Sequence, residues 1–193
     1  MFEQQQPIEV DLGCGRGAFL VWAARSRPTV NFVGIDRLLG RLRKVAGKVD
    51  RAGLANVRLL RIEGSYFVKY LLPARSIAAY HIFFSDPWPK RRHHPRRLFD
   101  DEFVRELQRT LVPEGVVNIA TDDEAYAQSI HRLFAASRQF VAESPDVLPV
   151  DGQTEFEGRC LAGGLPIFRM RWRSGAGISR DRPPESAAPD AVI

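Results

Sequence analysis

Sulfur-containing residues are scarce in this sequence. Its 193 residues include two cysteines and two methionines. Cys14 and Cys160 lie far apart, with no second Cys or His at metal-ligand spacing, so the sequence suggests neither a disulfide framework nor a zinc site. We therefore expect a reducing compartment, the cytoplasm, and no bound metal.

Long apolar runs and a secretory signal are also missing. No run approaches the length that crosses a bilayer, and the first ten residues, MFEQQQPIEV, lack the basic start and apolar centre of a signal peptide. We expect a soluble protein that is made and kept inside the cell.

The composition predicts one domain with an excess of positive charge. Hydrophobic residues make up 45% of the chain, enough for a real core, and the net charge is +5. This excess is modest, so the clustering of charge says more than the total. Residues 174–193 carry almost no large apolar groups, and we predict a domain over residues 1–173 followed by a disordered tail.

Short β-like runs alternate with helical patterns, which predicts an α/β fold with a mostly parallel sheet and helices on both faces. The predicted strands are IEVDL, NFVGI, VRLLRI, AYHIFF and VVNIA, with IFRMRWR as a late antiparallel edge. The predicted helices are AFLVWAARS, LLGRLRKVAGKVDRAG and DDEFVRELQRTL. The last helix has Asp100 or Asp101 as its N-cap, and PEG is expected to close it.

A glycine-rich turn follows the first predicted strand. Gly13, Gly15 and Gly17 let the backbone turn sharply and approach a ligand at the start of a helix. The spacing is GxGxG, not the GxGxxG of dinucleotide-binding folds. Asp36 ends the second strand, where a carboxylate can accept both hydroxyls of a ribose, so a nucleoside fits better than a dinucleotide.

Acidic residues stand at the ends of the first three strands, the edge at which open α/β sheets bind their ligands. Asp11 lies beside the glycine turn, Asp36 ends the second strand and Glu63 follows the third. S-adenosylmethionine would use all three, with Asp36 on the ribose, Glu63 near the adenine amine and Asp11 near the cationic tail. The alternative for each acid taken alone is a solvated loop carboxylate.

The segment SDPWPKRRHHPRR, residues 85–97, combines a rigid acidic and aromatic loop with a basic block. Asp86 falls at the end of the fourth strand, Pro87 and Pro89 stiffen the loop, and Trp88 offers a flat face for stacking. The cations that follow can neutralise phosphates, which favours RNA with an exposed base over duplex DNA. The alternative is a charged surface loop.

These residues resemble the tRNA (guanine-N7)-methyltransferases. The resemblance rests on FSDPWPKRRHHPRRL together with VDLGCGRG, GID, IATDDEAY and TEFE, and it covers about residues 8–173. It implies a Rossmann-like class I methyltransferase fold that uses S-adenosylmethionine to methylate N7 of a guanine in tRNA. A monomer or a homodimer is compatible with it.

The resemblance also implies roles for individual residues. The expected contacts to the methyl donor are Asp11, Gly13, Gly15, Gly17, Asp36, Glu63 and Asp86. The expected contacts to the substrate are Lys90, Arg92, His93, Arg96, Arg97, Asp122, Thr154 and Glu157. Asp86 is the first candidate for the catalytic residue and Asp122 the second. Thr154 and Glu157 would have to fold back over the site.

Three features depart from the family pattern. Pro95 replaces a basic residue, and Asp11 and Glu63 each exchange one acid type for the other, which keeps the charge. The first strand begins at Ile8, whereas family members carry a further N-terminal segment that helps to hold tRNA. We therefore expect either that this chain is a trimmed form of the protein or that its affinity for RNA is reduced.

The implied reaction needs no general base. Guanine N7 carries no proton at neutral pH, so catalysis would depend on alignment and on acidic groups that stabilise the developing charge.

Two other functions are compatible with parts of the sequence. They are a non-catalytic RNA-binding protein and a nicotinamide-dependent oxidoreductase. The cations of the second helix either extend the RNA surface or only solubilise it; they are Arg41, Arg43, Lys44, Lys48 and Arg51.

Overall fold

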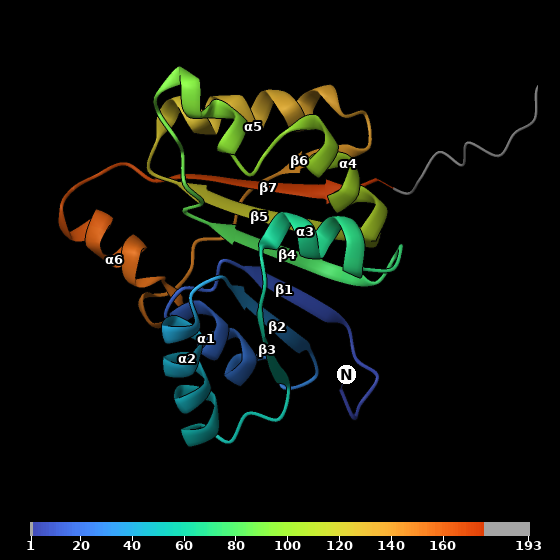
Figure 1. The fold of residues 1–193 in the computed structure, drawn as a ribbon, viewed down its shortest axis with the longest axis vertical. Helices are drawn as coiled ribbons and strands as arrows, with labels where there is room; N and C mark the ends of the chain where they lie inside the picture. Colours follow the sequence, from blue (N-terminus) through green and yellow to red (C-terminus); the bar gives the residue numbers. More distant parts are fainter. Residues whose placement is uncertain (1, 176–193) are drawn as a thin grey trace, which may run out of the picture.

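The computed structural model describes residues 2–175, and they form one seven-stranded sheet with helices on both faces (Figure 1). The strand order is β3-β2-β1-β4-β5-β7-β6. The strands are β1 (Ile8–Leu12), β2 (Asn31–Asp36), β3 (Val57–Arg61), β4 (Ile77–Phe83), β5 (Leu111–Thr121), β6 (Phe140–Glu143) and β7 (Phe168–Ser174). The predicted tail lies outside the described residues from position 176 onward.

The connections between the parallel strands are helical, as the alternating pattern predicts. The helices are α1 (Ala18–Ser26), α2 (Leu39–Arg51), α3 (Gly64–Tyr66), α4 (Asp101–Thr110), α5 (Glu124–Ala136) and α6 (Glu155–Ala162). The shorter turns are η1 (Phe67–Leu71), η2 (Arg91–Arg96) and η3 (Val150–Gly152). Among residues 2–175, no helix combines the length and the apolar character needed to span a membrane.

Strands β1 to β5 pair in parallel, and β7 runs antiparallel to both β5 and β6. The expected antiparallel C-terminal edge of the sheet is therefore confirmed, although the IFRMRWR strand, β7, lies inside it and β6 is the outermost strand. The short strand β6 was not predicted from the sequence. Asp100 is the N-cap of α4, since its side chain accepts a hydrogen bond from the backbone N–H of Phe103 at 2.7 Å.

The predicted role of the Pro-Glu-Gly sequence in closing α4 was wrong. The helix ends at Thr110, and the Pro-Glu-Gly sequence lies inside β5. The pairing of β4 with β5 shifts register there, between the partners of Ile77 and Ala79, and Glu114 has a φ of 65°. The turn-forming residues therefore make an irregularity in a strand, as in a β-bulge, instead of a helix stop.

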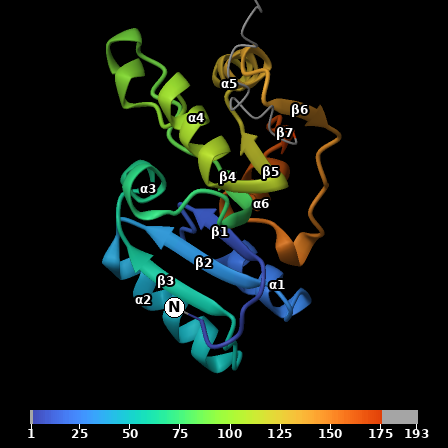
Figure 2. The ribbon, with the colours of Figure 1, turned by 90° about the vertical axis from the view of Figure 1, so that its right-hand side faces the viewer.

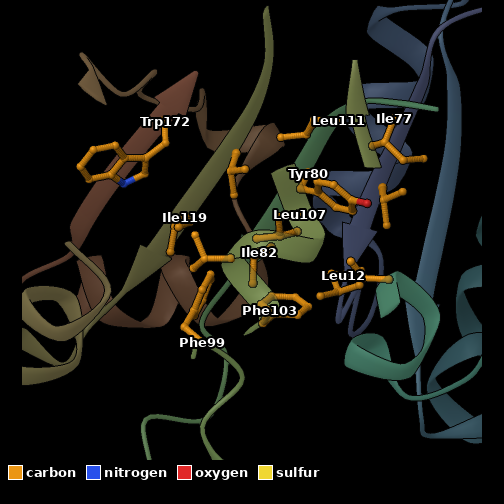
Figure 3. Close-up of a cluster of buried hydrophobic side chains, with 14 of the residues drawn as sticks. Leu12, Ile77, Tyr80, Ile82, Phe99, Phe103, Leu107, Leu111, Ile119 and Trp172 are labelled. Atoms are coloured by element: carbon orange, nitrogen blue, oxygen red, sulfur yellow. The ribbon is translucent and has the colours of Figure 1, made fainter. Parts of the chain in front are cut away.

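Two apolar layers enclose the sheet. The larger layer packs β1, β4, β5 and β7 against α4 and α5, with Trp172 stacked on Phe134 at 5.3 Å between ring centroids. Figure 3 shows this cluster around Tyr80, Ile82 and Leu107. The smaller layer lies under α1 and α2 on the other face. Figure 2 shows the two groups of helices on opposite sides of the strands.

Polar side chains line the second face of the central strands. The imidazole of His81 lies 2.8 Å from Glu9 and 3.3 Å from the amide of Asn118, which in turn accepts a hydrogen bond from Arg171 at 3.0 Å. Burial lowers the pKa of His81, which agrees with a neutral ring that donates to Glu9 and accepts from Asn118. His81 therefore has a structural role inside β4.

Candidate active site

The glycine-rich loop adopts a conformation that depends on its glycines. The backbone φ angles of Gly13, Gly15 and Gly17 are 89°, 56° and 73°. A Cβ atom at Gly17 would also lie 2.7 Å from a methyl carbon of Val45 in α2. Glycine at this position thus allows both a left-handed backbone and the close approach of α2 to the loop.

Asp36 holds this loop in place. Its carboxylate accepts hydrogen bonds from the backbone N–H of Leu38 at 2.8 Å and of Gly15 at 3.2 Å, and Arg41 lies 3.5 Å away. The residue is only 6% exposed. A ribose contact, as the sequence predicts, would have to share the carboxylate with these backbone groups.

Asp11 lies on β1, next to the strand β2 that carries Asp36, and it is also buried, at 4% exposure. Burial, together with the negative charge of Asp36, raises the pKa of the Asp11 carboxyl to about 8. Burial, reinforced by the carboxylates of Asp11 and Asp36, also raises the pKa of the Cys14 thiol. Cys14 is therefore a packed residue and not an activated nucleophile.

Glu63 makes a different contact from the one that its position suggested. Its two carboxylate oxygens accept hydrogen bonds from the backbone N–H groups of Ser65 at 3.0 Å and Tyr66 at 2.7 Å. The side chain thus caps the short helix α3. It does not line the cavity described next, so its contact with a methyl donor remains a prediction.

A cavity of about 930 Å³ lies between the glycine-rich loop, the end of β4 and α6. Asp11 lies at its base and Asp86 at its rim, where the side chain is exposed and follows β4. The lining residues are Asp11, Gly13, Cys14, Gly15, Arg16, Gly17, Ala18, Arg41, Phe83, Phe84, Asp86, Thr154, Glu155, Phe156, Gly158, Arg159 and Ala162. Segments far apart in the sequence therefore share one site.

Helix α6 forms one wall of this cavity. In Figure 1 it lies beyond the carboxyl ends of β4 and β5. Glu155 accepts a hydrogen bond from Arg16 of the glycine-rich loop at 2.8 Å, and the rings of Phe84 and Phe156 lie 4.8 Å apart. Thr154 caps the helix by accepting from the backbone N–H of Glu157 at 3.0 Å. The segment thus folds back over the site, as the expected role of Thr154 requires.

Glu157 points away from the cavity. It is 2% exposed and forms an ion pair with Arg169 of β7. Asp122 follows β5 and is half-buried, and it adds to the effect of burial in raising the pKa of Cys160 in α6. Neither carboxylate lines the cavity, and their contact with substrate remains a prediction.

The basic block is organised around Trp88. The guanidinium of Arg96 lies 5.1 Å from the centre of the Trp88 ring, and His93 meets the ring at 5.6 Å in a T-shaped contact. Arg97 donates a hydrogen bond to the carbonyl of Pro87 at 2.7 Å and lies over the ring of Tyr126. Lys90 and Arg92 are exposed. The indole therefore supports the cations beside the cavity, in addition to any stacking on a base.

Sequence reasoning missed several residues that line the cavity, among them Arg16, Glu155, Phe84 and Phe156. Phe156 and Glu155 lie within the TEFE segment, and Phe84 is the last residue of the AYHIFF run. All three therefore belong to segments that the sequence analysis had already singled out. No local pattern showed that the two phenylalanines meet, because 72 residues separate them.

The residues of the cavity fit S-adenosylmethionine. Its volume, about 930 Å³, lies within the range of small-molecule sites. Asp11 at the base can balance a positively charged ligand, and the left-handed glycines leave the loop backbone free of side chains at 13, 15 and 17. The phenylalanines at 83, 84 and 156 add apolar surface. Within the described part of the chain, no group of three or more His, Cys, Asp or Glu residues is arranged to hold a metal ion.

Comparisons of sequence place the chain among known methyltransferases. Residues 5–170 match the family model described as "Putative methyltransferase". A tRNA (guanine-N(7)-)-methyltransferase of Syntrophotalea carbinolica is 32% identical over 100% of this chain and 83% of its own length. That of Buchnera aphidicola is 31% identical over 90% and 74%. The chain spans 54% of the length of the Thermotoga maritima enzyme, which is 32% identical over 87% of the chain.

Comparisons of structure agree on the fold. The 16S rRNA methyltransferase KamB superimposes with a TM-score of 0.66 at 15% identity, over 89% of each chain. An S-adenosylmethionine-dependent methyltransferase of Aquifex aeolicus gives 0.59 at 16% identity, over 89% of this chain and 85% of its own. Identities this low support the Rossmann-like methyltransferase fold and nothing finer.

Proposed function

This chain belongs to the tRNA (guanine-N7)-methyltransferase family, and on that premise we propose that it methylates N7 of a guanine in tRNA with S-adenosylmethionine as the methyl donor. The observation that carries the proposal is the shared cavity. Asp11 and the glycine-rich loop lie on one side of it, and Asp86 and Thr154 lie on the other. The donor and the target base would meet between them.

S-adenosylmethionine supplies an activated methyl group: the guanine N7 lone pair forms the new C–N bond, the S–C bond breaks, and the positive charge passes from sulfur to the purine. No proton has to leave N7, so no general base is needed. The protein contributes alignment and negative charge close to the reacting atoms.

Asp86 is the proposed catalytic residue. It lines the cavity, its side chain is exposed, and it follows directly on β4 in a loop stiffened by two prolines. A carboxylate there would stabilise the charge that develops on guanine. It could also accept a hydrogen bond from the guanine edge, which adenine would not match. Asp122 is the second candidate, although it lies outside the cavity lining.

The basic residues beside the cavity are the proposed contacts to the RNA backbone. Lys90, Arg92 and His93 lie close to Asp86 in the sequence, and Trp88 supports Arg96 and His93. Phosphate contacts of this kind position the substrate without reading its sequence. The proposed location is the cytoplasm, since tRNA is the proposed substrate and both cysteines are free thiols.

The test is transfer of labelled methyl from S-adenosylmethionine to unmodified tRNA, with the product nucleosides digested and identified. We expect label in 7-methylguanosine with the wild-type chain and at least a hundred-fold slower transfer with Asp86→Asn, a loss of the size seen when one electrostatic group is removed. Asp101→Asn is the matched control, because Asp101 is exposed on α4 and does not line the cavity.

Donor binding, measured by calorimetry, separates the outcomes. Binding without transfer to any RNA would favour the non-catalytic RNA-binding alternative. Label in another nucleoside would refute the proposed substrate atom. Equal rates of methyl transfer for Asp86→Asn and Asp101→Asn would show that Asp86 is not the catalytic residue.

A further inference from the structure

Helix α2 carries a row of cations on one flank. Arg41, Lys44 and Lys48 are spaced by three and four residues, which places them one above the other along the helix. The buried residues Leu42, Val45 and Val49 define the side that packs on the sheet. Around the helix axis, Arg43 falls about 100° from Lys44 and about 160° from Arg41, on the other side of the buried stripe.

The flank with Lys44 faces the glycine-rich loop. Lys48 donates a hydrogen bond to the backbone carbonyl of Arg16 at 2.8 Å. Arg41 lies 3.5 Å from Asp36 and lines the same cavity as Asp86. Lys44 stands between these two residues along the helix, on the same flank, and it is exposed.

Two of the three cations on this flank, Lys44 and Lys48, have no carboxylate partner among residues 2–175, whereas Arg41 pairs with Asp36. Each arginine of β7 forms an ion pair with a carboxylate: Arg169 with Glu157, and Arg171 and Arg173 with Glu143. By contrast, neither Lys44 nor Lys48 has an ion pair with any residue in the range 2–175. The only carboxylate on α2 is Asp50, near its C-terminal end.

A second group of cations lies on the other side of the cavity. In Figure 1, α2 lies below α6 and the bright green turn of residues 91–96 lies above it, and Figure 2 keeps the same vertical order. The cavity opens between them, since Arg41 and Asp86 both line it. A polyanion that reaches the cavity therefore passes cations on both sides.

We propose that the α2 flank of Arg41, Lys44 and Lys48 binds the phosphate backbone of the tRNA, opposite the basic block of residues 90–97. The inference deepens the proposed function and depends on tRNA being the substrate. The partner is RNA because cations on both sides of a nucleoside site, Lys44 and Lys48 among them without an ion pair in residues 2–175, suit a phosphate backbone that continues beyond the target base in both directions. Arg43 lies outside this flank and is not part of the proposed surface.

The test compares two charge reversals on neighbouring residues, Lys44→Glu and Arg43→Glu. Both residues are exposed and neither has an ion pair within the described chain, so both variants should fold and lose the same net charge. Equilibrium binding to labelled tRNA is measured by fluorescence anisotropy at about 0.1 M salt. We expect about ten-fold weaker binding for Lys44→Glu and less than two-fold for Arg43→Glu.

The salt dependence gives a second measurement. Lys44→Gln should lower the slope of log K against log salt by about 1, as expected when one phosphate contact is lost, and Arg43→Gln should leave it unchanged. Affinity for S-adenosylmethionine should be the same in all four variants, because neither residue lines the cavity.

The outcomes separate this inference from the proposed function. If Lys44 variants bind tRNA as well as Arg43 variants while methyl transfer proceeds, the surface is refuted and the function stands. If the Lys44 effect is seen but no methyl is transferred, the surface stands and the function fails. A wild-type chain that binds no tRNA, or that binds an acidic protein through Lys44 instead, overturns the inference.

Discussion

Asp11 and Asp36 are buried on adjacent strands, and the charge of Asp36, added to burial, raises the pKa of Asp11 to about 8. At neutral pH the free protein therefore holds a proton on Asp11 in most molecules. A cationic ligand in the cavity would favour the ionised form, so ligand binding and proton release are coupled at this residue.

Stability should fall with rising pH because of Asp11. Its ordinary pKa is 3.8, so between about pH 4 and pH 8 the folded chain binds a proton that the unfolded chain releases. The contribution is complete below pH 4 and lost as the pH passes 8. Urea unfolding of the wild type and Asp11→Asn at pH 6, 7, 8 and 9 measures it. The variant should gain stability relative to the wild type up to about pH 8; parallel curves would contradict the raised pKa.

Gly17→Ala should destabilise the fold by about 2 kcal/mol, from a positive φ and a clash with Val45. Val45→Ala in the same chain relieves only the clash, so the double variant should be about 1 kcal/mol more stable than the sum of the two single changes. Gly40→Ala is the control, because a Cβ atom there meets nothing within 4 Å. Additive effects in urea unfolding would show that Val45 and Gly17 are not in contact.

Substitutions of Glu157 and Glu155 should differ in how much they lower the free energy of unfolding. Glu157→Ala leaves Arg169 without its buried partner, and we expect a loss of about 3 kcal/mol in the free energy of unfolding. Glu155→Gln breaks an exposed ion pair and should cost less than about 1 kcal/mol. Thermal unfolding measures both. A stable Glu157→Ala variant with a raised KM for tRNA would instead support the substrate contact predicted from the sequence.

Variants of Arg97 and Arg92 should distinguish residues that stabilise the loop from residues that contact RNA. Arg97→Gln removes the hydrogen bond to Pro87 and the contact with Tyr126, so we expect about 1–2 kcal/mol lower stability. Arg92→Gln should leave stability unchanged and lower the salt slope of tRNA binding by about 1. Urea unfolding and binding at several salt concentrations test the pair. The reverse assignment of the two effects would show that Arg92 holds the loop.

The order of helices and strands could be predicted from the sequence because local patterns determine it. The five predicted central strands all form, and Asp100 caps α4 as expected. Strand β6 was missed because it has only four residues, Phe140–Glu143, and forms by pairing with β7. The Pro-Glu-Gly sequence was misread because its turn chemistry serves equally well for a helix stop and for a strand irregularity.

The site was predicted less completely than the fold. The positions of Asp11, Asp36 and Asp86 near strand ends predicted that they lie at the carboxyl edge of the sheet, since parallel strands end at the same edge. They did not tell us what each carboxylate contacts. Glu63 is engaged by the backbone of α3 and Glu157 by Arg169, and both partners depend on the packed chain. The meeting of Phe84 with Phe156 depends in the same way on how α6 folds back.

The place of β7 inside the sheet has a consequence for synthesis on the ribosome. β7 is the last strand within residues 2–175, yet it lies between β5 and β6. Until residues 168–174 emerge, β5 has one open edge, β6 has no partner, and Phe134 lacks the indole of Trp172 that stacks on it. Open strand edges and exposed apolar rings are the features that lead nascent chains to aggregate. The nascent protein thus exposes these edges and rings until β7 has been translated, even though the five parallel strands β1 to β5 are already complete.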